Sequence, residues 1–218
     1  VAEHTIALLF AAARELAAMD RAMRAGTWLR REGVQLAGRT LGLVGFGGIA
    51  AEVARIARAI GMRVIAWNRT PRLAAGVEFV AIERLLPDSD AVSLHLLLND
   101  ETRGFLSRAR IAAMRPGAIL VNTARGALVD EDAMADALRS GRLGHAALDV
   151  FAVEPLPAGH ALTALANVTL SAHSAFRTPK ANMRLTPSGP GAVTMPSSRA
   201  RSSRASGFAS MRLRRKRS

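Results

Sequence analysis

The sequence predicts an α/β fold in which a doubly wound parallel sheet is covered by helices on both faces. Two observations predict it. From Leu41 onward, short and nearly continuous apolar runs alternate with amphipathic segments, as buried parallel strands alternate with helical crossovers. The first apolar run leads directly into a glycine-rich turn at 45–50, and a helical segment follows that turn. The chain has 218 residues, half of them apolar, which is enough to bury a core of this kind.

The predicted elements follow in chain order. Residues 1–25 have apolar residues at helical spacing and predict one helix, which Gly26 and Trp28 end. Strands are predicted at the apolar runs Leu41–Phe46, Val64–Trp67, Val77–Val80, Ala91–Leu96, Ala118–Asn122, Ala146–Val150 and Val168–Ala172. Helices are predicted between them, at Ile49–Ile60, Ser107–Met114 and Asp130–Ser140.

The turn at 45–50 has the pattern G-x-G-x-x-A, which is typical of a dinucleotide site. Gly45 permits the tight turn, Gly47 lets the backbone approach a pyrophosphate, and Ala50 allows the helix to pack closely on the strand. The start of the helix offers unpaired N–H groups and a positive dipole end to the phosphates. With a strand before it and a helix after it, the motif predicts a Rossmann-type domain rather than a plain structural turn. The predicted cofactor contacts here are Gly45, Phe46, Gly47, Gly48 and Ile49.

The second predicted strand is followed by Asn68, Arg69 and Thr70, which we expect to face the ribose of the cofactor. An acidic residue here would hold the 2′-hydroxyl and repel a 2′-phosphate. Asn68 is neutral, and Arg69 and Arg72 supply cations. We therefore predict an NAD(P) cofactor, with NADP favoured over NAD. The alternative is that both arginines are ordinary solvated charges of a loop.

Several further stretches, in one order and at plausible spacing, resemble the D-isomer-specific 2-hydroxyacid dehydrogenases over residues 1–185. They are Val1-Ala2-Glu3-His4-Thr5, Leu94-His95-Leu96 with Thr102-Arg103-Gly104, Val121-Asn122-Thr123-Ala124-Arg125-Gly126, Leu148-Asp149-Val150-Phe151 with Glu154-Pro155, and Ser171-Ala172-His173-Ser174-Ala175. The resemblance implies an oxidoreductase that acts on the CH–OH group of a D-2-hydroxy acid, or reduces a 2-keto acid. It also implies a homodimer that pairs through the first helix. The cofactor contacts that it implies are His95, Thr102, Thr123, Ala124, Asp149 and Ser174, with Asp149 at the nicotinamide end.

Arg125, Glu154 and His173 are the candidate catalytic residues. His173 can donate a proton because the pKa of histidine lies near neutrality, and a carboxylate such as Glu154 favours the protonated ring. Arg125 can hold the substrate carboxylate and polarise its carbonyl with a planar guanidinium. All three follow predicted strands, where open α/β sheets place their sites. Taken singly, each could instead be a structural or surface residue. The other histidines are not proton-donor candidates, and His145 and His160 are expected at the surface or in loops.

The resemblance also divides the chain. Residues 1–30 are expected to be the long helix between domains, residues 31–176 the NAD(P)-binding domain, and residues 177–185 a remnant of the return to a substrate domain. That second domain is largely missing, and the chain, which begins with Val1, is expected to start inside a longer parent protein. Two alternatives to an active enzyme therefore stay open: a nucleotide-binding regulatory module, and a catalytically broken fragment.

Residues 186–218 form the last predicted segment, a basic tail. It holds eight basic and no acidic residues, so that residues 1–185 carry 22 of the 30 Lys and Arg and all 17 Asp and Glu. Most of the net charge of +13 therefore belongs to the tail, which we expect to be disordered. It lacks the aromatic platforms on which bases stack, and we predict no nucleic-acid partner. A frameshift near residue 185 would produce such a tail; a translation of the other two frames that shows no family-like helix would refute this.

Cysteine and membrane signals are absent from the sequence. With no cysteine, disulfides and thiolate metal sites are excluded, and we predict no metal site and a cytoplasmic location. The longest early uncharged run, Thr5–Ala13, is shorter than the roughly 20 apolar residues that cross a bilayer. Glu3 and the lack of a basic leader argue against a secretory signal. The predicted partners are therefore a small 2-hydroxy or 2-keto acid and a second copy of the chain, without a membrane.

Overall fold

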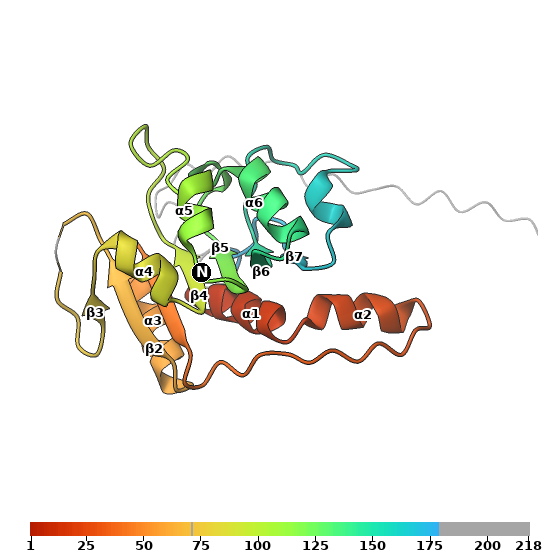
Figure 1. The fold of residues 1–218 in the computed structure, drawn as a ribbon, viewed down its shortest axis with the longest axis horizontal. Coiled ribbons are helices and arrows are strands. Elements are labelled where there is room, and N and C mark those ends of the chain that lie inside the picture. Colours follow the sequence, from red (N-terminus) through yellow and green to blue (C-terminus); the bar gives the residue numbers. More distant parts are fainter. Residues whose placement is uncertain (71, 179–218) are drawn as a thin grey trace, which may run out of the picture. The chain divides into compact units, whose positions relative to one another are not determined.

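A single parallel sheet organises the chain in a computed structural model that describes residues 1–70 and 72–178 (Figure 1). Within these residues the sheet has seven strands, in the order β3-β2-β1-β4-β5-β6-β7, and every neighbouring pair is parallel. The strands are β1 Thr40–Val44, β2 Arg63–Trp67, β3 Glu78–Phe79, β4 Ala91–Leu94, β5 Ala118–Asn122, β6 Leu143–Leu148 and β7 Val168–Leu170. The predicted doubly wound parallel sheet is confirmed.

The register of the strands aligns their last residues. Val44 at the end of β1 pairs with Trp67 of β2 on one side and with Leu94 of β4 on the other. The row continues through Asn122 of β5, Leu148 of β6 and Leu170 of β7. The loops that follow these strands therefore emerge side by side along one edge, here called the carboxyl edge. The chain runs outward from β1 to β3 and then returns to β4 on the other side of β1. Open α/β sheets bind their ligands at such a reversal.

Helices cover both faces of the sheet, which gives three layers (Figure 1). On one face lie α1 (Ala2–Ala13) and α3 (Gly48–Ala59), and on the other lie α4 (Ile82–Asp88), α5 (Arg108–Ala113) and α6 (Glu131–Arg139). The described residues also include two short 3-10 helices, η1 (Gly126–Leu128) and η2 (Ala161–Ala164). Each face has its own buried apolar cluster. The central strands β1, β4 and β5 are buried at every position, which explains their continuous apolar sequences.

The prediction of one helix over residues 1–25 is wrong, because the structure has two. The second helix, α2 (Leu16–Arg24), follows a break at Glu15, whose φ of 50° is left-handed. The carbonyl of Ala13 accepts the N–H of Val34 at 2.7 Å instead of continuing the helix. α1 is buried against the sheet and α3, whereas α2 has no buried residue. Two successive amphipathic helices share one apolar periodicity, and the sequence pattern did not separate them.

The prediction that His145 lies at the surface or in a loop is wrong. It lies in β6 with 4% of its area exposed, and its Nε2 is 2.9 Å from the hydroxyl of Thr169. Burial, with a smaller contribution from the charge of Arg21, lowers the pKa of His145 to about 4. The ring is therefore neutral at pH 7 and belongs to the core. His160 does lie in a loop, where its Nδ1 accepts the N–H of Leu162 at the start of η2.

The predicted domain boundaries fall partly outside the described residues. Val1–Thr178 forms one compact unit. The expected basic tail at 186–218, and most of the expected remnant at 177–185, lie beyond it. In the part of the chain that the structure describes, no helix combines the length and the apolar character that crossing a membrane requires.

Candidate functional site

The glycine turn begins the site at the carboxyl edge. Gly45 follows β1 with a φ of 89°, which favours glycine, and its N–H donates to the carbonyl of Trp67 at 2.9 Å. A Cβ on Gly45 would lie 2.9 Å from the carbonyl carbon and oxygen of His95, closer than real Cβ atoms approach backbone. The turn after β1 therefore packs directly on the chain that leaves β4, and only glycine fits between them.

The start of α3 presents an open backbone surface. Apart from the adjoining backbone, no atom of the described residues lies within 4 Å of where a Cβ would stand on Gly47 or Gly48, and no side chain caps the helix at Gly47. Ile49 is 46% exposed, while Ala50 is fully buried against the sheet. This arrangement fits a pyrophosphate, because the first N–H groups of the helix are accessible to an anion.

Asn68 ties the end of β2 to the glycine turn. Its Oδ1 accepts the N–H of Phe46 at 3.0 Å, and its Nδ2 donates to the carbonyl of Thr70 at 2.7 Å. The Phe46 ring is buried and packs edge-to-face on Phe79, 5.1 Å between ring centres. The segment that we expect at the ribose therefore lies beside the turn that we expect at the phosphates. The next residue, Arg69, forms an ion pair that the sequence did not predict, with its Nη1 2.5 Å from the Oε2 of Glu101.

The loop after β4 carries the next two predicted cofactor contacts. His95 is hydrogen-bonded to the hydroxyl of Ser93 at 3.0 Å, and burial lowers the pKa of His95 to about 4, which keeps the ring neutral. The hydroxyl of Thr102 donates to the carbonyl of Leu97 at 2.6 Å and accepts the N–H of Asn99 at 2.8 Å. The side chain of Thr102 thus stabilises the loop itself, and a cofactor contact by Thr102 stays a prediction.

The loop after β5 is organised by Asn122, which sequence reasoning missed. Its buried amide accepts the N–H of Ala124 at 3.0 Å and donates to the carbonyl of Arg125 at 2.9 Å. The hydroxyl of Thr123 is turned inward to the hydroxyl of Thr5 on α1, at 2.8 Å. Arg125 is exposed at the tip of the loop, and its Nη1 donates to the carbonyl of Ala124 at 2.6 Å. The loop therefore holds its backbone firmly and presents the guanidinium to solvent.

Gly126 lets this loop meet the loop that follows β6. A Cβ on Gly126 would stand 1.9 Å from the carbonyl carbon of Phe151 and 2.4 Å from the N of Ala152. Backbone therefore packs on backbone at this point, and any side chain would force the two loops apart. The close approach brings the positive charge of Arg125 near enough to lower the pKa of Glu154.

Asp149 is the centre of the third part of the site. It is fully buried and follows the last residue of β6. Its Oδ1 accepts the N–H of Ser174 at 2.9 Å and also the hydroxyl of Ser171. Its Oδ2 accepts the N–H of Ala175 at 2.8 Å. Burial acts to raise the pKa of Asp149, but these hydrogen bonds and the charge of His4 outweigh it and hold the pKa below its ordinary value. Asp149 is thus an ionised acceptor that shapes the loop at 171–175.

His173 lies at the tip of that loop. Its φ of 45° is left-handed, and its N–H donates to the carbonyl of Asp149 at 2.8 Å. Its ring Nδ1 is 2.6 Å from the Oε2 of Glu154, and its ring meets that of Phe176 edge-on. The other oxygen of Glu154 accepts the N–H of Phe151 at 2.9 Å. With Nδ1 donating to Glu154, Nε2 is the nitrogen that can serve a substrate.

The surroundings of Glu154 favour the ionised form of its carboxyl group. Partial burial acts to raise the pKa of Glu154. The hydrogen bonds from His173 and from the N–H of Phe151, with the charges of His173 and Arg125, outweigh this effect and lower the pKa. The sequence-predicted pair of Glu154 and His173 is therefore joined by a hydrogen bond, its surroundings favour the ionised form of Glu154, and Arg125 lies close by.

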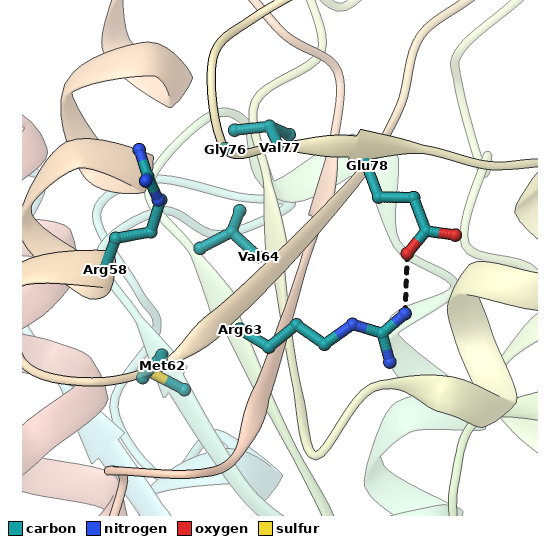
Figure 2. A pocket seen from close by; sticks show the side chains of 7 residues that line it. All are labelled: Arg58, Met62, Arg63, Val64, Gly76, Val77 and Glu78. Atoms are coloured by element: carbon teal, nitrogen blue, oxygen red, sulfur yellow. Dashed lines mark hydrogen bonds and ion pairs between the residues drawn. The ribbon is translucent and has the colours of Figure 1, made fainter.

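A hollow of about 590 Å³ opens beside this pair. It is mainly apolar and is lined by Phe151, Glu154, Pro155, Leu156, Leu170, Ser171, Ala172 and His173. A second hollow, of about 430 Å³, is shown in Figure 2. Its lining comes from the end of α3, from the start of β2 and from Gly76–Glu78, including the ion pair of Arg63 and Glu78 at 2.6 Å. It lies at the opposite edge of the sheet from the glycine turn and is not part of the candidate site.

The first turn of α1 also reaches the site, which the sequence did not indicate. The Nε2 of His4 is 2.9 Å from the hydroxyl of Ser171 and 3.3 Å from the Oδ1 of Asp149. Its neighbour Thr5 contacts Thr123. Two successive residues of α1 therefore support the loops that carry His173 and Arg125. In the sequence, His4 was part of a stretch that resembles the first helix of the family, and it carried no sign of these partners.

The predicted site residues thus gather along the carboxyl edge, in the loops after β1, β2, β4, β5, β6 and β7. The part expected to bind the nucleotide consists of the glycine turn, Asn68 and the chain leaving β4. The residues expected to act on the substrate are Arg125, Glu154 and His173, and these roles stay predictions. Among the described residues, no cluster of three His, Asp or Glu side chains could hold a metal ion.

Comparisons with known proteins agree with this geometry. A family model described as "D-isomer specific 2-hydroxyacid dehydrogenase, NAD binding domain" matches residues 6–175. A glyoxylate reductase of Aeropyrum pernix is 43% identical over 197 residues, covering 84% of this chain and 59% of that protein. The crystal structure of a glyoxylate reductase from Paecilomyes thermophila is 38% identical with a TM-score of 0.80, covering 84% of this chain and 57% of that one.

A third relative was solved with a cofactor. It is a D-isomer specific 2-hydroxyacid dehydrogenase from Xanthobacter autotrophicus Py2 in complex with NADPH and MES. It is 37% identical with a TM-score of 0.72, and the match covers 79% of this chain and 56% of that chain. In each of these three comparisons the chain spans less than two thirds of the relative's length.

Proposed function

The chain belongs to the D-isomer specific 2-hydroxyacid dehydrogenase family, and from this premise we propose that it is the cofactor-binding part of an NAD(P)-dependent oxidoreductase. The proposed reaction interconverts a D-2-hydroxy acid and the corresponding 2-keto acid. The observation that carries the proposal is the hydrogen bond of 2.6 Å between His173 and Glu154, at the same sheet edge as the open glycine turn.

The residues of the site have distinct proposed roles. Gly47 and Gly48 bind the pyrophosphate through the backbone at the start of α3. When bound, the nicotinamide ring supplies or accepts the hydride. His173 gives a proton from Nε2 to the carbonyl oxygen of the 2-keto acid, while Glu154 stabilises the positive charge of the imidazolium. Arg125 binds the substrate carboxylate with its guanidinium.

A preference for NADP over NAD is part of the proposal. It rests on the neutral Asn68, whose amide is engaged with the turn, and on the cation Arg69 next to it. A 2′-phosphate would meet no carboxylate at position 68 and could pair with a guanidinium. A cytoplasmic location, inferred from the lack of cysteine, stays a prediction.

The proposal predicts binding and turnover that can be measured on the chain itself. Quenching of tryptophan fluorescence should show binding of both NADPH and NADH, with NADPH tighter. Absorbance of the reduced cofactor should then fall when glyoxylate or hydroxypyruvate is added. A clear preference for NADH would contradict the NADP assignment. Binding without turnover would favour the regulatory module or the broken fragment, and no binding by a folded chain would contradict the proposal as a whole.

We further propose that the chain forms a homodimer through α2 and the segment after it. Large apolar side chains are exposed there: Leu16 is 51%, Met23 50% and Trp28 72% exposed. Large apolar side chains that stay exposed in one segment favour a role for that segment in a protein interface. We expect sedimentation to show a dimer, and the double variant Met23→Glu, Trp28→Glu to sediment as a monomer that still binds cofactor. A parent chain that sediments as a monomer would contradict this interface.

A further inference from the structure

Glu101 stands in ion-pair contact with the cation that we expect at the ribose. From this contact we propose that Glu101 is a specificity-determining residue that opposes a 2′-phosphate on the dinucleotide. The inference rests on the proposed function, since it requires that the glycine turn binds a dinucleotide. In this inference the carboxylate of Glu101 competes with the 2′-phosphate for Arg69, and so it weakens the preference for NADP that Asn68 and Arg69 favour.

The ion pair joins two loops that leave different strands. Arg69 follows β2 and Glu101 follows β4, and these strands lie on opposite sides of β1. The contact of 2.5 Å between Arg69 Nη1 and Glu101 Oε2 therefore connects the loops on either side of the glycine turn. Both side chains are well exposed, 76% for Arg69 and 70% for Glu101. A cofactor phosphate could therefore reach them without disturbing the core.

The loop at 97–102 holds Glu101 in place. The N–H of Thr102 donates to the Oδ1 of Asn99 at 2.9 Å, and the N–H of Asn99 donates to the hydroxyl of Thr102 at 2.8 Å. These reciprocal bonds close a tight turn around Glu101. On the opposite side, Asn68 ties the chain before Arg69 to the glycine turn. Hydrogen bonds therefore hold the backbone on both sides of the ion pair, which favours one fixed arrangement of Arg69 and Glu101 over many.

The electrostatic consequence differs between the two cofactors. A phosphate monoester carries a charge of about −1.5 to −2 at pH 7. To pair with it, Arg69 must release Glu101, and the freed carboxylate then stands next to the phosphate with the same sign of charge. A ribose with a free 2′-hydroxyl meets no such repulsion. Removal of the charge of Glu101 should therefore strengthen binding of NADPH and leave binding of NADH nearly unchanged.

The test is a fluorescence titration of the full chain with NADPH and with NADH. In Glu101→Gln we expect NADPH to bind about 3 to 10 times more tightly at low salt, and NADH to change less than about twofold. The gain should shrink at roughly 1 M salt, where the Debye length is about 3 Å. In an Arg69→Gln background, Glu101→Gln should increase the affinity for NADPH less, because Glu101 then has no guanidinium to compete for.

Two control variants separate the ion pair from charge in general. Glu78→Gln removes a carboxylate that is 44% exposed and forms an ion pair with Arg63 (Figure 2), away from the glycine turn, and it should alter neither affinity. Asp100→Asn removes a charge from the same loop, and it should increase the affinity for NADPH less than Glu101→Gln does. Equal gains in both loop variants would overturn the assignment to Glu101.

The outcomes distinguish this inference from the function on which it rests. If the parent chain binds both dinucleotides and Glu101→Gln gains nothing on NADPH, or loses affinity for it, the inference fails and the proposed function stands. If a parent chain with the expected circular dichroism binds neither dinucleotide, the proposed function fails and the inference fails with it.

Discussion

Replacing His173 with Gln is expected to lower the rate of 2-keto acid reduction by about 10²- to 10⁴-fold, because the proton donor is lost. The affinity for the reduced cofactor should stay within about twofold of the parent, since the residues placed at the pyrophosphate lie in the turn after β1. His173 is partly exposed, so the substitution removes little buried surface. Single-turnover absorbance with glyoxylate or hydroxypyruvate measures the first quantity, and fluorescence titration measures the second.

A second histidine provides the control for this prediction. His160 also lies in a loop and also contacts a carboxylate, with its Nε2 3.0 Å from Glu131. The substitution His160→Gln keeps an acceptor for the start of η2 and should leave turnover unchanged. Similar losses in both variants would show that the effect on His173 is structural. Unchanged turnover in His173→Gln would remove His173 from the proposed mechanism.

Substitution of Glu154 tests whether its charge supports proton donation by His173. Glu154→Gln keeps a side chain that can accept a hydrogen bond from His173, but it removes the negative charge that favours the protonated ring. Proton donation should then weaken first at the alkaline end of the pH range, while the loss at acidic pH stays smaller. A uniform loss at every pH would indicate that Glu154 only positions the ring.

The parts of the site that were predictable from the sequence share one property: each is encoded locally. The glycine turn is six consecutive residues between a strand and a helix, and the left-handed φ of Gly45 confirms the tight turn that the motif predicts. Arg125 and His173 stand directly after strands, and parallel strands deliver their ends to one edge. The strands themselves were predictable because both faces of the sheet are buried.

The parts that were not predictable depend on distant partners. The break between α1 and α2 follows from the bond of the Ala13 carbonyl to Val34, and neither residue marks it in the sequence. His4 approaches Asp149 and Ser171 only because α1 crosses the strand ends. Arg69 and Glu101 lie on two loops with β3, α4 and β4 between them in the chain. Such contacts leave no period or motif, since they form only when the sheet brings the loops together.

The largest expected loss of stability comes from Asp149. Asp149→Ala should lower the free energy of unfolding by about 3–5 kcal/mol, because the N–H groups of Ser174 and Ala175 lose their acceptor inside the protein. Asp149→Asn keeps the shape and one acceptor oxygen, so we expect a smaller loss, of about 1–3 kcal/mol. Urea unfolding followed by circular dichroism measures both. Asp136→Asn is the control, since its carboxylate is exposed and pairs only with surface arginines among the described residues.

The acid sensitivity of the fold provides an independent check on Asp149. Its pKa in the folded chain lies below the ordinary value of 3.8, so the unfolded chain binds the proton more readily. The stabilisation from Asp149 is therefore complete above about pH 4 and is lost as the pH falls through the folded-state pKa. Asp149→Asn should be less stable than the parent at pH 7 and should lose less stability on acidification. Parallel curves for the two proteins would contradict an ionised Asp149.

The same substitution separates support of the loop from catalysis. Asp149 holds the loop at 171–175 through its carboxylate, and its carbonyl accepts the N–H of His173. A weakened loop would leave the ring of His173 free to leave Glu154, so Asp149→Asn should lower turnover even though the proton donor is intact. His173→Gln, in contrast, should lower turnover with little loss of stability. If both variants lowered turnover and stability in the same proportion, the loop would act as one folding unit, and Asp149 would have no separate positioning role.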